Sequence, residues 1–144
     1  MKPLLVGEQN PYQSDPRLAQ RYALYPDPPR CAGWNLCHKV MQLDEGEYLR
    51  RFDRVNLCDG KWSMKEARAW ERNNQEAYLY RPVVLFGAKV CSVFRVKFEP
   101  FTFHNWERFG SYTILPHPSG LSRAWNEPGA YERARAVLKE AGVL

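Results

Sequence analysis

The sequence has no apolar run long enough to cross a bilayer, for which a helix needs roughly 20 predominantly apolar residues. It also lacks a cationic start followed by an apolar segment, so we expect no export signal and a cytoplasmic location. Internal repeats and low-complexity segments are missing too. These absences exclude a membrane-spanning helix, a solenoid of repeats and a compositionally biased chain.

Cysteine is sparse, and its four positions, Cys31, Cys37, Cys58 and Cys91, contain no CxxC pair. In a chain without an export signal, we expect free thiols rather than disulfides. A zinc site formed by Cys31, Cys37 and His38 is the alternative, but no second CxxC or HxxxH pair supports it. We therefore expect neither a metal nor another cofactor.

The chain does contain enough apolar material for one core. Of its 144 residues, 44% are hydrophobic and 14% are aromatic, which is typical of a globular protein with a single domain spanning residues 1–144. The net charge of +5 and the isoelectric point near 9.1 are compatible with a polyanionic partner such as DNA. We expect no membrane partner and a monomer.

Strand-like and helix-like segments alternate along the chain. Strands are expected at residues 4–7, 53–57, 83–86 and 112–115, of which the first and third are short apolar runs. Spacing and capping signals predict helices at residues 32–43, 63–80 and 128–140, with a short one after residue 88. Four strands separated by helices indicate an α/β fold, a three-layer α/β/α sandwich around a central, mainly parallel four-stranded sheet.

Three segments are less sharply defined by the sequence. Residues 13–30 form a long, proline-punctuated loop, which at this length is usually functional or mobile. Residues 93–109 are aromatic and partly alternating, so a hairpin and an irregular excursion both remain open. Asn126 and Pro128 are expected to cap and open the last helix.

Three polar residues fall at or just beyond the ends of predicted strands, namely Asn10, Asn56 and His117. Asn10 precedes a proline, which favours an extended backbone at that position. In open parallel sheets, ligands bind outside the carboxyl ends of the strands. The element pattern therefore predicts that these three residues share one site.

The loop at residues 115–125 combines features of a DNA-contacting loop. Two prolines fix φ on either side of His117, and Gly120 allows a close approach of the backbone to a bulky partner. Leu121 is then pushed outward, two residues before Arg123. An apolar wedge beside a cation is used to unstack a base and to hold phosphates. The alternative is a proline-rich strand-to-helix turn with a solvated histidine and arginine.

Two segments resemble motifs of the uracil-DNA glycosylase superfamily. Residues 9–12 read Gln-Asn-Pro-Tyr, which is similar to the water-activating Gln-Asp-Pro-Tyr motif of family-one enzymes and to the Asn-Pro motif of the mismatch-specific uracil and thymine enzymes. Residues 117–123 read His-Pro-Ser-Gly-Leu-Ser-Arg, which resembles a hybrid of the same two groups. The resemblance implies a monofunctional DNA glycosylase that flips a base from DNA, hydrolyses its N-glycosidic bond and leaves an abasic site.

The resemblance also implies the catalytic pair. His117 would donate a hydrogen bond to a carbonyl of the departing base and stabilise its negative charge. Asn10 would hold the attacking water, but an amide is no strong general base, and its alternative role is an Asx-turn within its own loop. The mismatch-specific enzymes also carry Asn at this position, which implies modest activity.

The predicted base-binding set comprises Gln9, Tyr12, Asn56 and Trp34. Tyr12 would crowd C5 of the base and exclude thymine, as the resemblance to family-one enzymes implies. Asn56 can pair with the carbonyl and imide N–H of a uracil-like edge, or hydrogen-bond the adjacent loop instead. A flipped base is usually held against an aromatic ring, for which Trp34 and Tyr25 are both candidates.

The predicted DNA-binding set lies in the loop after the last strand: Ser119, Gly120, Leu121, Ser122 and Arg123. By resemblance, Leu121 would fill the gap left by the flipped nucleotide. Arg123 would contact the opposite strand or a phosphate, and Ser119 could bond a backbone phosphate.

Two other classes of function remain open. One is a non-catalytic or repurposed nucleic-acid-binding domain of the same fold, which the asparagine at position 10 and the short chain favour. The other is an enzyme that acts on a modified base or a free nucleoside. An assay for abasic sites in oligonucleotides that contain one uracil separates these classes.

Overall fold

The computed structural model describes residues 1–9, 22–107, 110–120 and 122–144. Its centre is one five-stranded sheet with the strand order β2-β1-β3-β5-β4. The strands are β1 (Leu4–Gln9), β2 (Asp53–Cys58), β3 (Arg81–Phe86), β4 (Thr102–Trp106) and β5 (Gly110–Leu115). All neighbouring pairs are parallel except β4 and β5, which are antiparallel. The α/β class and the mainly parallel sheet are confirmed, but the prediction of four strands was one too few.

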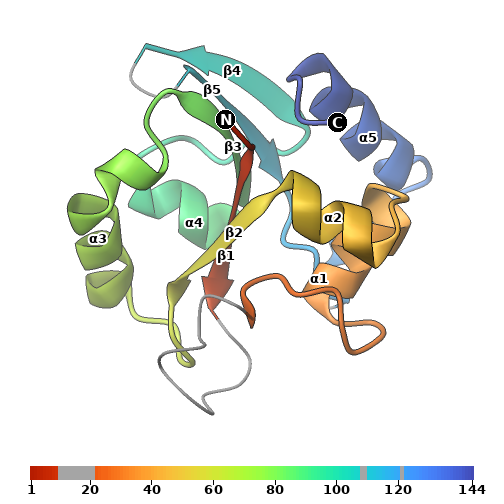
Figure 1. Cartoon of the computed structure of the whole chain (residues 1–144), viewed down its shortest axis with the longest axis horizontal. Helices are drawn as coiled ribbons and strands as arrows, with labels where there is room; N and C mark the ends of the chain where they lie inside the picture. The colour runs from red at the N-terminus through yellow and green to blue at the C-terminus, as the bar shows by residue number, and fades with distance from the viewer. Residues whose placement is uncertain (10–21, 108–109, 121) are drawn as a thin grey trace.

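Helices cover both faces of this sheet (Figure 1). Helices α3 and α4 lie on one face, and α1, α2 and α5 lie on the other. The helical segments are α1 (Ala32–Trp34), the π-helical η2 (Asn35–Val40), α2 (Glu45–Arg51), α3 (Met64–Asn73), η3 (Gln75–Ala77), α4 (Ala88–Val93), η4 (Arg123–Asn126) and α5 (Ala130–Glu140). In the described ranges, none of these helices is long and apolar enough to cross a membrane.

Strand β1 shows why the sheet has two separate cores. Successive side chains of a strand point to opposite faces, so Leu5 packs with α2 and α5 while Leu4 and Val6 pack on the side of α3 and α4. All three side chains are almost fully buried. A strand that is apolar on both faces has to lie inside a sheet covered by helices on both sides.

The fifth strand, β4, lies in the segment for which the sequence left a hairpin and an irregular excursion open. It pairs with β5 from Thr102 opposite Ile114 to Trp106 opposite Gly110. The His104 ring stacks on Tyr112, which faces it across the ladder, with 4.9 Å between centroids. Because β4 is the edge strand, its residues are only partly buried, and this weakens the apolar alternation that marks a strand.

Two helix predictions need correction at their ends, and one helix was not predicted. The expected helix at residues 32–43 is a short α1 that continues as the π-helical η2 and ends at Val40. The helix that begins after Ser63 ends at Asn73, well before residue 80. Helix α2 was missed, although Asp44 caps it by accepting a hydrogen bond from the Glu47 N–H at 2.8 Å.

The last helix begins at Ala130, later than Asn126 and Pro128 indicated. Residues 123–126 form the separate turn η4, because the buried Trp125 turns inward and its Nε1 donates to the carbonyl of His117 at 2.8 Å. Gly129, with φ at 78°, then reverses the chain into α5.

Tyr48 of α2 forms a hydrogen bond that anchors the segment around Leu24, and its removal can be tested. Its buried hydroxyl donates to the carbonyl of Leu24 at 2.8 Å. We expect Tyr48→Phe to lower the free energy of unfolding by about 1–3 kcal/mol, because a buried acceptor loses its donor. Urea denaturation measures this change. Tyr80→Phe is the matched control, since Tyr80 is 77% exposed, and equal losses in both variants would contradict the assignment.

Candidate functional site

A cavity of about 740 Å³ opens at the carboxyl ends of β1, β2 and β5. Its lining comes from the end of β1, residues 22–33, β2, the start of α4 and the loop after β5. Strand β1 connects to β2 on one side, whereas β3, its neighbour on the other side, connects to β4 and β5 in the opposite direction. Such a point in an open parallel sheet is the usual location of a ligand site. The topology therefore marks this cavity as the candidate site.

The cavity brings together six residues of the predicted site. They are Gln9, Asn56, His117, Ser119, Gly120 and Ser122. Asn10, Tyr12 and Leu121 were also predicted there, but they lie outside the described residues. The single site expected at the strand ends is thus seen for Asn56 and His117.

The aromatic lining differs from the prediction. Tyr25 lines the cavity, whereas Trp34 does not. The Trp34 ring packs against His38 instead, with 4.9 Å between centroids, and the Lys39 ammonium lies 5.9 Å from its centroid. Trp34 is thus engaged with neighbours in the same helical segment. Of the two aromatic candidates, Tyr25 is the one that lines the cavity.

His117 is held in one tautomer. Its Nδ1 accepts a hydrogen bond from the backbone N–H of Ser119 at 3.2 Å, so in the neutral ring the proton resides on Nε2. Burial lowers the pKa of His117, Glu8 opposes this shift, and Lys89 adds to it. With its pKa below the ordinary value, the ring is neutral at pH 7. His117 thus presents a neutral Nε2–H donor.

Asn56 reaches the cavity across the neighbouring strand. It pairs in register with Gly7 of β1, and a Cβ built on Gly7 would lie 2.2 Å from the Asn56 Oδ1. The amide therefore lies directly over the glycine, in space that any other residue would fill. Asn56 is 3% exposed and lines the cavity, so its amide is fixed by the packing around it.

A second glycine, Gly33, lets the backbone of residues 24 and 25 pack against α1 and form one wall of the cavity. A Cβ on Gly33 would lie 2.1 Å from the carbonyl oxygen of Tyr25 and 2.4 Å from that of Leu24. Arg54 reinforces this wall, because its Nη1 donates to the carbonyl of Ala23 at 2.8 Å and its guanidinium lies 5.7 Å from the Tyr25 ring centroid. The wall is therefore tied to β2 as well as to α1.

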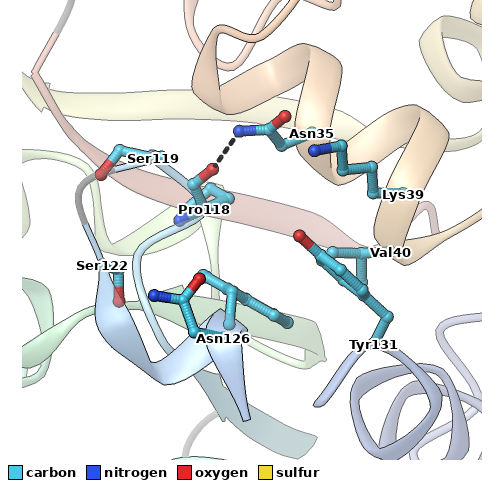
Figure 2. Close-up of a pocket in the computed structure, with 10 residues that line it drawn as sticks. Asn35, Lys39, Val40, Pro118, Ser119, Ser122, Asn126 and Tyr131 are labelled. Atoms are coloured by element: carbon cyan, nitrogen blue, oxygen red, sulfur yellow. Dashed lines mark hydrogen bonds between the residues drawn. The ribbon is translucent and has the colours of Figure 1, made fainter. Parts of the chain in front are cut away.

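The loop after β5 is anchored from η2. Asn35 donates from Nδ2 to the carbonyl of Pro118 at 3.0 Å (Figure 2). Behind this contact lies a smaller cavity of about 130 Å³, toward which η2, the loop and the start of α5 contribute Lys39, Ser119 and Tyr131. The bond between η2 and the loop fixes the backbone that carries His117.

The remaining DNA-contact predictions have mixed outcomes. A Cβ on Gly120 would meet none of the described atoms within 4 Å, so the expected close approach to a bulky partner stays a prediction. Arg123 is exposed at the start of η4 and lines neither cavity. Gly120 is an exposed part of the cavity lining, whereas Arg123 is exposed on the surface outside it.

Sequence reasoning missed four charged residues of the lining. Glu8 lies directly before the predicted motif on β1, and Lys89 lies in the first turn of α4. Asp27 and Arg30 lie in the wall at residues 22–33. Glu8 lies at the end of β1 and Lys89 lies just beyond the end of the neighbouring β3, which is the same signal that identified Asn56 and His117. Arg30 carried no such signal, because its position depends on how the long loop folds back.

The residues of the alternative zinc site have other partners. The Cys31 thiol accepts from the Trp34 N–H and donates to the carbonyl of Tyr25, both at 3.4 Å. Cys37 donates to the carbonyl of Leu43 at 3.3 Å, and burial raises its pKa to about 11. Within the described ranges, no group of three or more His, Cys, Asp or Glu side chains could hold a metal ion.

No protein-family model and no curated protein matches the chain. What the cavity can bind is therefore inferred from its own side chains. It offers an amide that both donates and accepts, a neutral imidazole donor, an aromatic face and charged groups of both signs. These groups suit a planar heterocycle with adjacent carbonyl and N–H groups, attached to a polar or anionic partner.

The state of His117 can be measured directly. We expect the ¹⁵N chemical shifts of its ring to report the neutral Nε2–H tautomer at pH 7, and the ring to titrate below 6.5, because burial disfavours the imidazolium. Folding then releases a proton from His117 at mildly acidic pH, so its contribution to stability falls as the pH drops below the unfolded value. A protonated ring at pH 7 would contradict this assignment.

Proposed function

We propose that the protein is a monofunctional DNA glycosylase, which flips uracil or a related base out of DNA and hydrolyses its N-glycosidic bond. The observation that carries the proposal is the meeting of Asn56 and His117 in one cavity at the carboxyl edge of the sheet. One is a fixed amide and the other is a neutral Nε2–H donor. An amide can read the alternating carbonyl and imide N–H of a uracil-like edge, because it carries both a donor and an acceptor.

The proposed chemistry requires stabilisation of a departing anion. As the bond between the sugar and the base breaks, negative charge develops on the carbonyl oxygens of the base. A positioned neutral donor stabilises that charge in a buried site, as an oxyanion hole does. His117 has this property because Ser119 fixes its tautomer and burial keeps it neutral. The Tyr25 ring supplies a face against which the flipped base can stack.

The charges around the cavity support a nucleic-acid substrate. Lys89 and Arg30 line it, Arg123 is exposed beside it, and the whole chain carries a net charge of +5. Cations at the rim of such a site bind backbone phosphates and make the affinity dependent on salt. The proposal includes a monomer that acts in the cytoplasm.

The His117→Ala variant tests the catalytic step. We expect single-turnover excision from an oligonucleotide with one uracil to fall about 10²–10³-fold, the usual cost of one lost oxyanion donor. Binding to the same DNA should change little, since the imidazole acts on charge that develops only in the transition state. Gel detection of cleaved abasic sites gives the rate. Wild-type protein that binds the DNA but never produces an abasic site would support the non-catalytic domain instead.

The Arg123→Ala variant tests the contact with DNA outside the cavity. If Arg123 binds a phosphate, its loss should weaken duplex binding and reduce the slope of log K against log salt by about 0.9. Fluorescence anisotropy at several salt concentrations measures the slope. Arg72→Ala is the matched control, because Arg72 is exposed on α3, which covers the other face of the sheet. An unchanged slope for Arg123→Ala would remove this residue from the interface.

A further inference from the structure

Glu8 is a carboxylate of the cavity to which the proposed chemistry has so far given no role. It is the second-last residue of strand β1 and is half-buried. It lines the cavity together with His117 and Lys89. A Cβ built on Gly87 would lie 3.2 Å from the Glu8 Oε1 and 3.4 Å from the His117 Cβ. Glu8 and His117 therefore approach each other over a glycine. Their charges are coupled, because Glu8 favours the protonated form of His117.

We propose that Glu8 is the general base that activates the attacking water, an inference that rests on the proposed glycosylase function. The residue expected to hold that water, Asn10, has an amide, and an amide does not usefully accept a proton. Among the described lining residues only Glu8 and Asp27 are carboxylates, and Asp27 belongs to the wall at residues 22–33. Glu8 is the one that neighbours His117.

The proton and electron changes of the step balance. A water proton passes to the Glu8 carboxylate while the water oxygen forms a bond to C1′ of the sugar. The bond between C1′ and the base nitrogen breaks, and its electron pair leaves with the base. His117 stabilises the resulting anion through Nε2–H, and the proton held by Glu8 returns to solvent or to the base. The products are an abasic sugar and the neutral base, without any further reactant.

Three groups act electrostatically on this part of the cavity. His117 approaches from the loop after β5, Lys89 from α4 and Cys58 from β2, and the last of these senses the charge of Glu8. Arg30 and Asp27 line the opposite wall. Lys89 partly offsets the negative charge of Glu8, so a carboxylate and a departing anion can occupy the same cavity.

The test compares Glu8→Gln with Glu140→Gln, which removes the same charge from an exposed position on α5. We expect Glu8→Gln to lower the single-turnover rate on uracil-containing DNA about 10²–10⁴-fold, the usual contribution of a general base. DNA affinity should stay within twofold, and the acidic limb of the pH–rate profile should disappear. Glu140→Gln should keep both the rate and the profile. In Glu8→Ala, added formate should restore part of the rate, because a small carboxylate can occupy the vacated space.

The outcomes separate the two proposals. If wild-type protein excises uracil but Glu8→Gln retains its rate and its acidic limb, Glu8 is not the base, and the glycosylase function stands. If Glu8→Gln is slow while the acidic limb persists and formate has no effect in Glu8→Ala, Glu8 acts only through the charge of His117, and the general-base role is overturned. If the wild-type protein excises no base, the proposed function itself fails.

Discussion

The rest of the structure depends on the burial of strand β1 on both faces and both edges. Its neighbours β2 and β3 satisfy its backbone groups, and helices cover Leu4, Leu5 and Val6 from opposite sides. Polar side chains are excluded from residues 4–7, the buried part of this strand. Its last two residues, Glu8 and Gln9, are its first polar ones, and they lie at the edge of the sheet where the connections diverge. The same constraint that forms the core therefore delivers polar groups to the cavity.

The cavity is shaped as much by missing side chains as by those present. Gly7 leaves room for the Asn56 amide, Gly33 lets the carbonyls of residues 24 and 25 approach α1, and Gly87 lies between Glu8 and His117. Each glycine serves a contact between segments far apart in the sequence. A larger residue at Gly7 or Gly33 would have to displace a neighbour by an ångström or more. Function in this site is therefore coupled to packing, because moving any wall also moves a polar group.

The sequence predicted what depends on local pattern and missed what depends on distant contacts. The alternation of strand-like and helix-like segments identified the four parallel strands, and the strand ends located Asn56 and His117. Strand β4 could not be assigned from the sequence, because it lies at the edge of the sheet and the apolar alternation of residues 102–106 is weak. The choice between Trp34 and Tyr25 could not be made locally, since it depends on the close approach at Gly33. Arg30 was missed for the same reason. Glu8 and Lys89, in contrast, lie at or just beyond the carboxyl ends of β1 and β3, so the strand-end signal that located Asn56 could have located them too.

Burial and the neighbouring Glu8 carboxylate act in opposite directions on the protonation of His117. A histidine next to a carboxylate tends to become protonated, and an imidazolium would form an ion pair with Glu8 that neutralises both partners. Here burial opposes protonation of His117, and Lys89 opposes it further. The imidazole is consequently neutral although a carboxylate lies beside it, and burial contributes more to this than the Lys89 charge at the start of α4. The proposed mechanism requires this state, in which a neutral donor lies beside a carboxylate without an ion pair between them.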